Sequence, residues 1–185
     1  MDYSLSGEDM ERVLSAEGIR ANISTYTDAV KHNIDHLLSR GAGVLCFETR
    51  PKYGHWIACW RNHEGLNWFD SYGIYPDDET HWNFDPEFKR AALEDRPRML
   101  AMLYEEHLRT GEPVVYNDVQ LQEHKPGVAT CGRHVCVRLS NWDLSCDEYI
   151  DLITAACKKH SVSPDELVVM ATRPYMRGTP SVAGF

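Results

Sequence analysis

The sequence predicts an α+β fold in which a small, mainly antiparallel sheet lies at the centre and helices flank it. Two observations carry this prediction. Short runs rich in aromatic and β-branched residues, which are typical of strands, lie between residues 44 and 70. Segments with helical periodicity precede and follow these runs. The length of 185 residues suits one domain over residues 1–185, and no repeat or low-complexity linker divides it.

Two helices and one strand are predicted towards the N-terminus. A helix fits Gly7–Ala16, with Ser6 as its N-cap. A second helix fits residues 27–40 and ends at Gly41. The short apolar run at 44–47 predicts a buried strand.

A β-hairpin is predicted next. The runs His55–Trp60 and Leu66–Asp70 are rich in aromatic or branched residues, as strands are. The polar loop between the two runs contains Asn62 and Gly65, which favour turns.

The remaining chain alternates helices with one strand. Residues 84–109 have a helical pattern that Pro97 interrupts, and the run Val114–Tyr116 predicts a strand. Further along, we expect a buried helix that starts at Cys131, amphipathic helices at 147–159 and 164–172, and a mobile tail at 177–185.

Composition and charge exclude some classes of function. The net charge of −9 and the pI of about 5.4 argue against a non-specific DNA-binding protein, which needs a basic surface. No run approaches the roughly 20 apolar residues that a membrane span needs. The sequence starts without a basic segment followed by an apolar run, so we expect an intracellular protein. The six cysteines are then expected to be reduced thiols, and no cofactor is expected.

The predicted hairpin gives one histidine and one aspartate a reason to meet. A turn centred between Asn62 and His63 places His55 directly opposite Asp70, with Cβ atoms about 4.5–5.5 Å apart. A carboxylate at that distance can accept the imidazole N–H, fix the tautomer and stabilise the imidazolium. A surface ion pair between two strands is the alternative interpretation of these residues.

Cys131 stands where a loop meets the predicted buried helix. If Thr130 caps that helix, the thiol lies in its first turn, where backbone N–H groups and the helix dipole favour the thiolate. Gly132 then leaves the backbone open where a substrate approaches. A buried structural cysteine is the alternative interpretation. A metal site at Cys131, His134 and Cys136 is disfavoured, because the spacing lacks a C-x2-C pair and a second cluster.

Four short motifs follow one another along the chain: Gly54-His55-Trp56, Phe69-Asp70-Ser71-Tyr72-Gly73, Gln120-Leu121-Gln122 and Thr130-Cys131-Gly132. In these motifs the chain resembles the adenovirus maturation protease and the ubiquitin-like-protein proteases, which form one clan of cysteine proteases. The likeness is strongest to proteases of large DNA viruses, virophages and polinton-type elements, and it spans residues 5–153. The resemblance implies a papain-like arrangement, as in the adenovirus protease.

The resemblance also implies a role for each motif. Cys131 would attack the peptide carbonyl and form a thioester. His55 would deprotonate the thiol and later protonate the leaving amine. Asp70 would orient His55, and Trp56 would line the substrate channel beside the histidine.

A glutamine completes the site that the resemblance implies. Its amide and the Cys131 backbone N–H would form the oxyanion hole. Gln122 is favoured for this role, although its spacing of 9 from Cys131 is a little longer than in the related proteases. Gln120 is the alternative, because two residues earlier it is expected to lie on the same strand face.

From the resemblance we expect a viral cysteine endopeptidase that cleaves capsid or core precursors during virion maturation, in the virion and the host cytoplasm. Removal of ubiquitin or a ubiquitin-like modifier is the alternative, and acetyl transfer by the same Cys and His is a more remote one. A non-enzymatic virion component that kept the fold is a different class of function. An activating peptide is a candidate partner, as in the adenovirus relative, whereas the acidic charge argues against activation by DNA.

Overall fold

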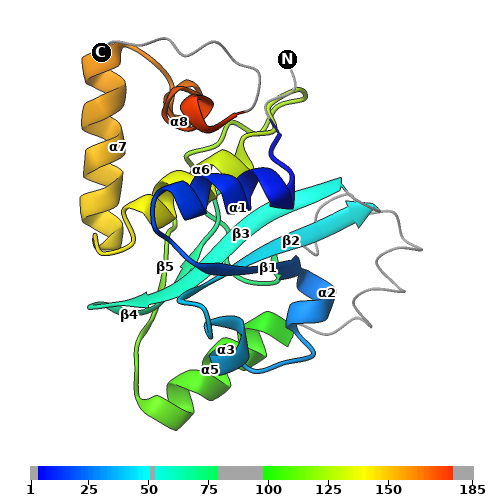
Figure 1. Ribbon diagram of the computed structural model, residues 1–185. Helices are drawn as coiled ribbons and strands as arrows, with labels where there is room; N and C mark the ends of the chain where they lie inside the picture. Colours follow the sequence, from blue (N-terminus) through cyan, green and yellow to red (C-terminus); the bar gives the residue numbers. More distant parts are fainter. Residues whose placement is uncertain (1–3, 51–52, 79–97, 177–185) are drawn as a thin grey trace.

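The computed structural model describes residues 4–50, 53–78 and 98–176 (Figure 1). Within these ranges a five-stranded sheet lies between two layers of helices, so the predicted α+β fold is confirmed. The helical pattern predicted at 84–97 and the tail predicted at 177–185 lie outside the described residues.

The sheet is mixed, and neighbouring strands follow one another in chain order. The strands are β1 (Ala21–Thr25), β2 (Ala42–Arg50), β3 (Tyr53–Asn62), β4 (Gly65–Phe69) and β5 (Val114–Tyr116). The three central strands pair antiparallel, as expected, whereas both edge strands join the sheet in parallel. Parallel neighbours need a crossover connection. Helices supply it between β1 and β2 and between β4 and β5.

Helices cover both faces of the sheet (Figure 1). One face carries α1 (Gly7–Ala16), α6 (Cys131–Ser140), α7 (Cys146–His160) and α8 (Pro164–Thr172), which the 3-10 helix Arg173–Tyr175 follows. The other face carries α2 (Tyr26–Ala29), α3 (Ile34–Leu37) and α5 (Arg98–Thr110). Among the described residues no helix is long and apolar enough to cross a bilayer.

Each face of the sheet has its own hydrophobic core. Alternate side chains of a strand point to opposite faces. Val44 and Ala58 therefore pack into the core beneath α1 and α6, whereas Leu45 and Ile57 pack into the core beneath α5. Because the central strands are buried on both faces, they form a rigid base for the residues at their ends.

Several predicted helix starts are confirmed. α1 begins after Ser6 and α8 begins after Ser163, and each serine forms a capping box with the acidic residue three positions later. α6 begins at Cys131, as predicted.

The single helix predicted at 27–40 is wrong, and the strand β1 before it was not predicted. The chain instead forms two short helices, because two polar side chains each start a new one. Thr25 Oγ1 accepts a hydrogen bond from the Asp28 N–H at 3.2 Å. Asn33 Oδ1 accepts one from the His36 N–H at 2.8 Å.

Candidate active site

The residues of the predicted triad come from three elements that meet at one end of the sheet. His55 lies near the start of β3, and Asp70 directly follows β4, the antiparallel neighbour of β3. Cys131 is the first residue of α6, which packs on β3. The three side chains are buried.

The hairpin turn lies one residue further along the chain than predicted. His63 and Glu64 form a two-residue turn, and Asn62 pairs with Gly65. The Asn62 side-chain oxygen accepts a hydrogen bond from the Glu64 N–H at 2.9 Å and closes the turn around these two residues. Gly65 has a φ of +130°, a conformation that glycine adopts without strain. The predicted centre between Asn62 and His63 is therefore wrong.

The shifted turn changes which residues face each other across the hairpin. Cys59 opposes Trp68, where the predicted register placed Leu66. The change amounts to two residues, and side chains alternate with a period of two. His55 and Asp70 therefore stay on the same side of the hairpin but are diagonal neighbours, which long side chains can still bridge.

His55 and Asp70 form a buried pair. The His55 Nε2–H donates to Asp70 Oδ1 at 2.9 Å, and the Asp70 side chain is 0% exposed. The same oxygen accepts the Tyr72 N–H at 2.7 Å, and the Tyr72 ring stacks on the imidazole with centroids 4.8 Å apart. Burial argues against the alternative of a surface ion pair. Since Asp70 takes Nε2, the ring nitrogen left for other chemistry is Nδ1.

Asn117 fixes the backbone of Asp70, and sequence reasoning missed it. Asn117 Oδ1 accepts the Asp70 N–H at 2.9 Å, and Asn117 Nδ2 donates to the Asp70 carbonyl at 2.7 Å. The side chain is buried and directly follows β5. A lone asparagine after a short apolar run is the only local signal, and it is typical of any strand end.

The Cys131 thiol lies among donors at the start of α6. The backbone N–H groups of Trp56 and Gly132 and the His55 side chain are donors close enough to the sulfur to lower the pKa of the thiol. Thr130 takes the N-cap position, but its hydroxyl donates to Asp165 on α8 and does not cap the helix. The predicted side-chain cap is therefore wrong, although the thiol does lie in the first turn.

The thiol and the imidazole shift each other's pKa. Burial raises the pKa of Cys131, but the hydrogen bond and positive charge of His55 lower it below its ordinary value. Burial lowers the pKa of His55, but the charge and hydrogen bond of Asp70, with the Cys131 thiolate, raise it well above its ordinary value. Both shifts act in the direction of a thiolate beside an imidazolium.

Gln122 lines the same groove as the thiol, and its amide is held in one orientation. Ser71 Oγ donates to Gln122 Oε1 at 2.7 Å, and the Ser71 carbonyl accepts the Gln122 N–H at 2.8 Å. The amide nitrogen, 3.5 Å from the Val128 carbonyl, is thereby left as the donor end of the side chain. Ser71 lies in the motif Phe69–Gly73, but the sequence alone did not indicate this role.

Gln120 does not reach the groove. It is exposed, and its amide donates to the Gln122 carbonyl at 2.9 Å. Residues 117–129 form no strand, so the expectation that both glutamines share a strand face is wrong. Gln122, and not Gln120, lines the same groove as Cys131.

A groove of about 900 Å³ contains these groups. His55, Gln122 and Cys131 line it, and its walls come from the start of α1, the ends of β1 and β2, and the loop before α6. Trp56 also lines it, and the Trp56 ring N–H donates to the Leu5 carbonyl at 3.0 Å. The N-terminal segment thus fixes the aromatic wall of the groove.

Comparison with known proteins places the chain in a viral family. No protein-family model matches the sequence. The protein named "Uncharacterized protein V9" of Sputnik virophage is 30% identical over 156 residues, which cover 83% of this chain and 86% of that protein. The chain belongs to this V9 family. It is therefore a viral protein.

Gly132 of this V9-family protein lies at a closely packed position. It does not line the groove. A Cβ atom at this position would lie 3.1 Å from Trp56 Cδ1 and 3.2 Å from atoms of Leu5 and Met10. These distances are a few tenths of an ångström shorter than ordinary contacts, so the small size of glycine favours close packing of α6 against Trp56 and the N-terminal segment.

The six cysteines of the V9-family chain are all free, and five of them lack the acidity of Cys131. Burial raises the pKa of three buried thiols to about 12: those of Cys46, Cys59 and Cys136. Burial also raises the pKa of the half-buried thiols of Cys146 and Cys157.

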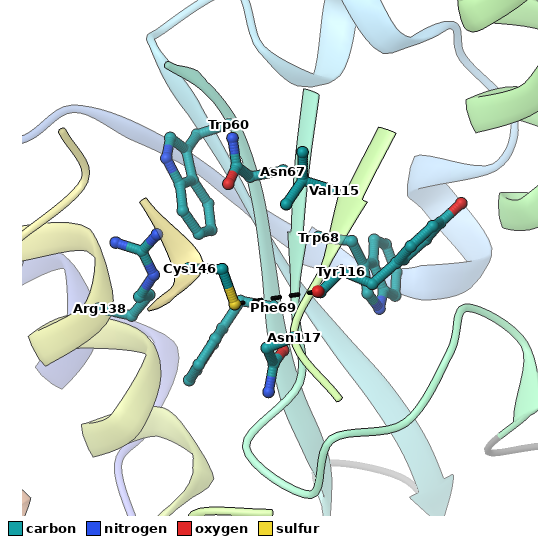
Figure 2. A pocket seen from close by; sticks show the side chains of 9 residues that line it. All are labelled: Trp60, Asn67, Trp68, Phe69, Val115, Tyr116, Asn117, Arg138 and Cys146. Carbon is teal, nitrogen blue, oxygen red and sulfur yellow. Dashed lines mark hydrogen bonds between the residues drawn. The ribbon is translucent and has the colours of Figure 1, made fainter. Parts of the chain in front are cut away.

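Neither a metal cluster nor the second hollow of the described chain provides such a site. Within the described ranges no group of three or more His, Cys, Asp and Glu side chains is placed to hold a metal. A second hollow, between α6 and the sheet, measures only about 10 Å³ (Figure 2). Arg138 and Cys146 are among the residues that line it. The Arg138 guanidinium stacks over the Trp60 ring, 4.5 Å from its centroid. Such a space holds about one water and no substrate.

Proposed function

We propose that this V9-family protein is a cysteine endopeptidase in which Cys131 is the nucleophile, His55 the base and Asp70 the carboxylate that orients the base. One observation carries the proposal. Of the six thiols in the chain, Cys131 alone has a pKa below its ordinary value, and it lines the groove. A buried cysteine without a chemical role has no need of an imidazole and two backbone donors.

The proposed reaction begins with attack of the Cys131 thiolate on a peptide carbonyl carbon. The carbonyl oxygen takes the negative charge, and the Cys131 backbone N–H and Gln122 Nε2 donate to it. His55 gives a proton to the leaving nitrogen, the C–N bond breaks and a thioester remains. Water then loses a proton to His55, attacks the thioester, and releases the acid product and the thiolate.

The proposed substrates are polypeptides, in particular capsid or core precursors of the virus. The groove of about 900 Å³ is large enough for several residues of an extended chain. Membership of a virophage protein family supports a viral substrate. The protease would then act in the virion and the host cytoplasm.

The test is to incubate wild type and Cys131→Ala with virion precursors and to find new N-termini by mass spectrometry. We expect new termini with the wild type alone. Precursors that stay intact, while an iodoacetamide probe labels Cys131 in the same sample, would contradict the proposal.

Three other outcomes identify the alternatives. Hydrolysis of a ubiquitin-like C-terminal fluorogenic substrate, without precursor cleavage, would assign the removal of such modifiers. An acetyl-enzyme formed from acetyl-CoA would assign acetyl transfer. Processing that Cys131→Ala leaves unchanged would assign a non-enzymatic role.

A further inference from the structure

Behind the groove, one carboxylate joins two segments that flank the proposed catalytic groups. Asp165 is the second residue of α8, which packs against α6 (Figure 1). Its Oδ2 accepts the Glu123 N–H at 2.9 Å. Its Oδ1 accepts the Thr130 hydroxyl and, at 3.1 Å, the His134 Nε2–H. Three donors from two segments therefore meet at one side chain.

Both segments adjoin the site. Glu123 directly follows Gln122, and Thr130 directly precedes Cys131. The chain between Glu123 and Thr130 forms neither helix nor strand, so no regular hydrogen-bonding pattern fixes the distance between its two ends. The distance between the Gln122 amide and the Cys131 thiol therefore depends on what holds the two ends of this loop.

The carboxylate is well suited to hold both ends. Burial raises the pKa of Asp165, but hydrogen bonds from His134, Thr130 and the Glu123 N–H lower it below its ordinary value. The charged form is therefore favoured, and both of its oxygens accept. His134 is 0% exposed, so it also anchors the carboxylate to the interior of α6.

We infer that Asp165 is a positioning residue, which acts on the reaction by fixing Gln122 relative to Cys131. The inference rests on the proposed function, in which these two residues are the oxyanion donor and the nucleophile. Ser71 holds the amide and the backbone N–H of Gln122, and Asp165 ties the next residue, Glu123, to Thr130 at the start of α6.

The test uses Asp165→Asn, which keeps the shape of the side chain but replaces one accepting oxygen with a donating NH2 group. Either Glu123 or Thr130 then loses its acceptor. Two small probes separate positioning from thiol reactivity. p-Nitrophenyl acetate acylates the thiol through a tetrahedral oxyanion, whereas chloroacetamide alkylates it by direct displacement. We expect acylation to slow about tenfold and Cys131 alkylation, followed by peptide mapping, to change by less than about twofold.

Two controls sharpen the result. Asp147→Asn removes an exposed carboxylate at the same position in the first turn of α7, and it should change neither rate. In a Gln122→Ala background, Asp165→Asn should slow acylation no further, because the residue acts through the amide.

Equal losses in both reactions, no loss in either, or full additivity with Gln122→Ala would overturn the inference. If circular dichroism shows that Asp165→Asn does not fold, Thr130→Val removes the hydroxyl donor alone. The same selective loss of acylation is expected, and equal rates would again overturn it. Failure of the proposed function is a separate observation: the wild type would leave precursors uncut, whatever the ratio of the two rates.

Discussion

Within the described ranges, two buried histidines each pair with an aspartate, and the two pairs differ in what surrounds them. In the pair of His55 and Asp70 the N···O distance is 2.9 Å, and the imidazole also hydrogen-bonds to the thiol. In the pair of His134 and Asp165 the distance is 3.1 Å. Nδ1 of His134 has no hydrogen-bond partner among the described residues. The first pair can pass a proton to a reacting group, and the second has nothing to pass it to.

The aspartates differ as well. Asp70 holds the imidazole and one neighbouring N–H, so its charge acts mainly on His55. Asp165 accepts hydrogen bonds from Glu123, in the loop after Gln122, and from Thr130 and His134 at the start of α6 and within it. Under the proposed function, the same two residue types serve chemistry where a groove reaches them and hold segments of the fold together where it does not. Environment decides the role, and the residue types alone do not.

The largest expected effect comes from replacing His55, and replacing His134 is the matched control. His55→Gln should reduce peptide hydrolysis by about 10³–10⁴-fold, because the base and acid are lost. It should also raise the pKa of Cys131, since the imidazolium that lowers it is gone. His134→Gln should leave that pKa unchanged. The pH dependence of iodoacetamide labelling measures the pKa of Cys131. An equal shift of this pKa in both variants would contradict the proposed difference between the two pairs.

Asp70→Asn should reduce hydrolysis by about 10²–10³-fold, because the imidazole loses its orienting charge. The carboxylate raises the pKa of His55, so its removal lowers that pKa. The imidazolium is then lost at a lower pH, and the alkaline limb of the rate profile should move down. Rates measured from pH 5 to 10 check this, and an unmoved limb would mean that Asp70 does not act on the reacting histidine.

Ser71→Ala should slow acylation by p-nitrophenyl acetate about tenfold, because the Gln122 amide is then free to rotate. Alkylation by chloroacetamide should not change. Ser71→Ala removes the hydrogen bond to the Gln122 side chain itself, whereas Asp165→Asn weakens the hydrogen bonds that hold the neighbouring backbone. If Ser71→Ala has no effect on acylation while Gln122→Ala does, orientation of the amide is not limiting.

The smallest effect concerns stability. Asp165→Asn should lower the free energy of unfolding by about 1–3 kcal/mol at pH 7, where the carboxylate is charged. The folded-state pKa of Asp165 lies below its ordinary value, so its contribution is present above the unfolded pKa of about 3.9 and is lost as pH falls through the folded pKa. Urea unfolding at pH 7, 5 and 3 should show wild type and variant converging. A constant difference would mean that charge does not matter there.

Some of the site could be predicted from sequence because its cause is local. The period of two along a hairpin placed His55 and Asp70 on the same side, even though the register was wrong by two residues. The register itself depends on the Asn62 side chain, whose hydrogen bond selects the turn at His63 and Glu64. The residue types in this loop fit a turn centred one residue earlier equally well. Similarly, Thr25 and Asn33 divide a region whose periodicity fits one helix.

The supporting residues could not be predicted, because their contacts join segments far apart in the sequence. These contacts are Ser71 to Gln122 at a separation of 51, Asp70 to Asn117 at 47, and Thr130 to Asp165 at 35. Each uses a common polar residue in an ordinary local setting. Only the assembled fold shows that their hydrogen bonds lead to the site.

The place of α8 in the chain bears on the order of synthesis. All the groups proposed to take part in the reaction leave the ribosome before Asp165, since Cys131 is the last of them. A nascent chain that ends between these two residues has its nucleophile but lacks the carboxylate that holds Gln122 in place. In the proposed scheme, full activity therefore begins only when α8 has emerged and folded. A growing polypeptide is thus restrained from cutting its neighbours until α8 has been made.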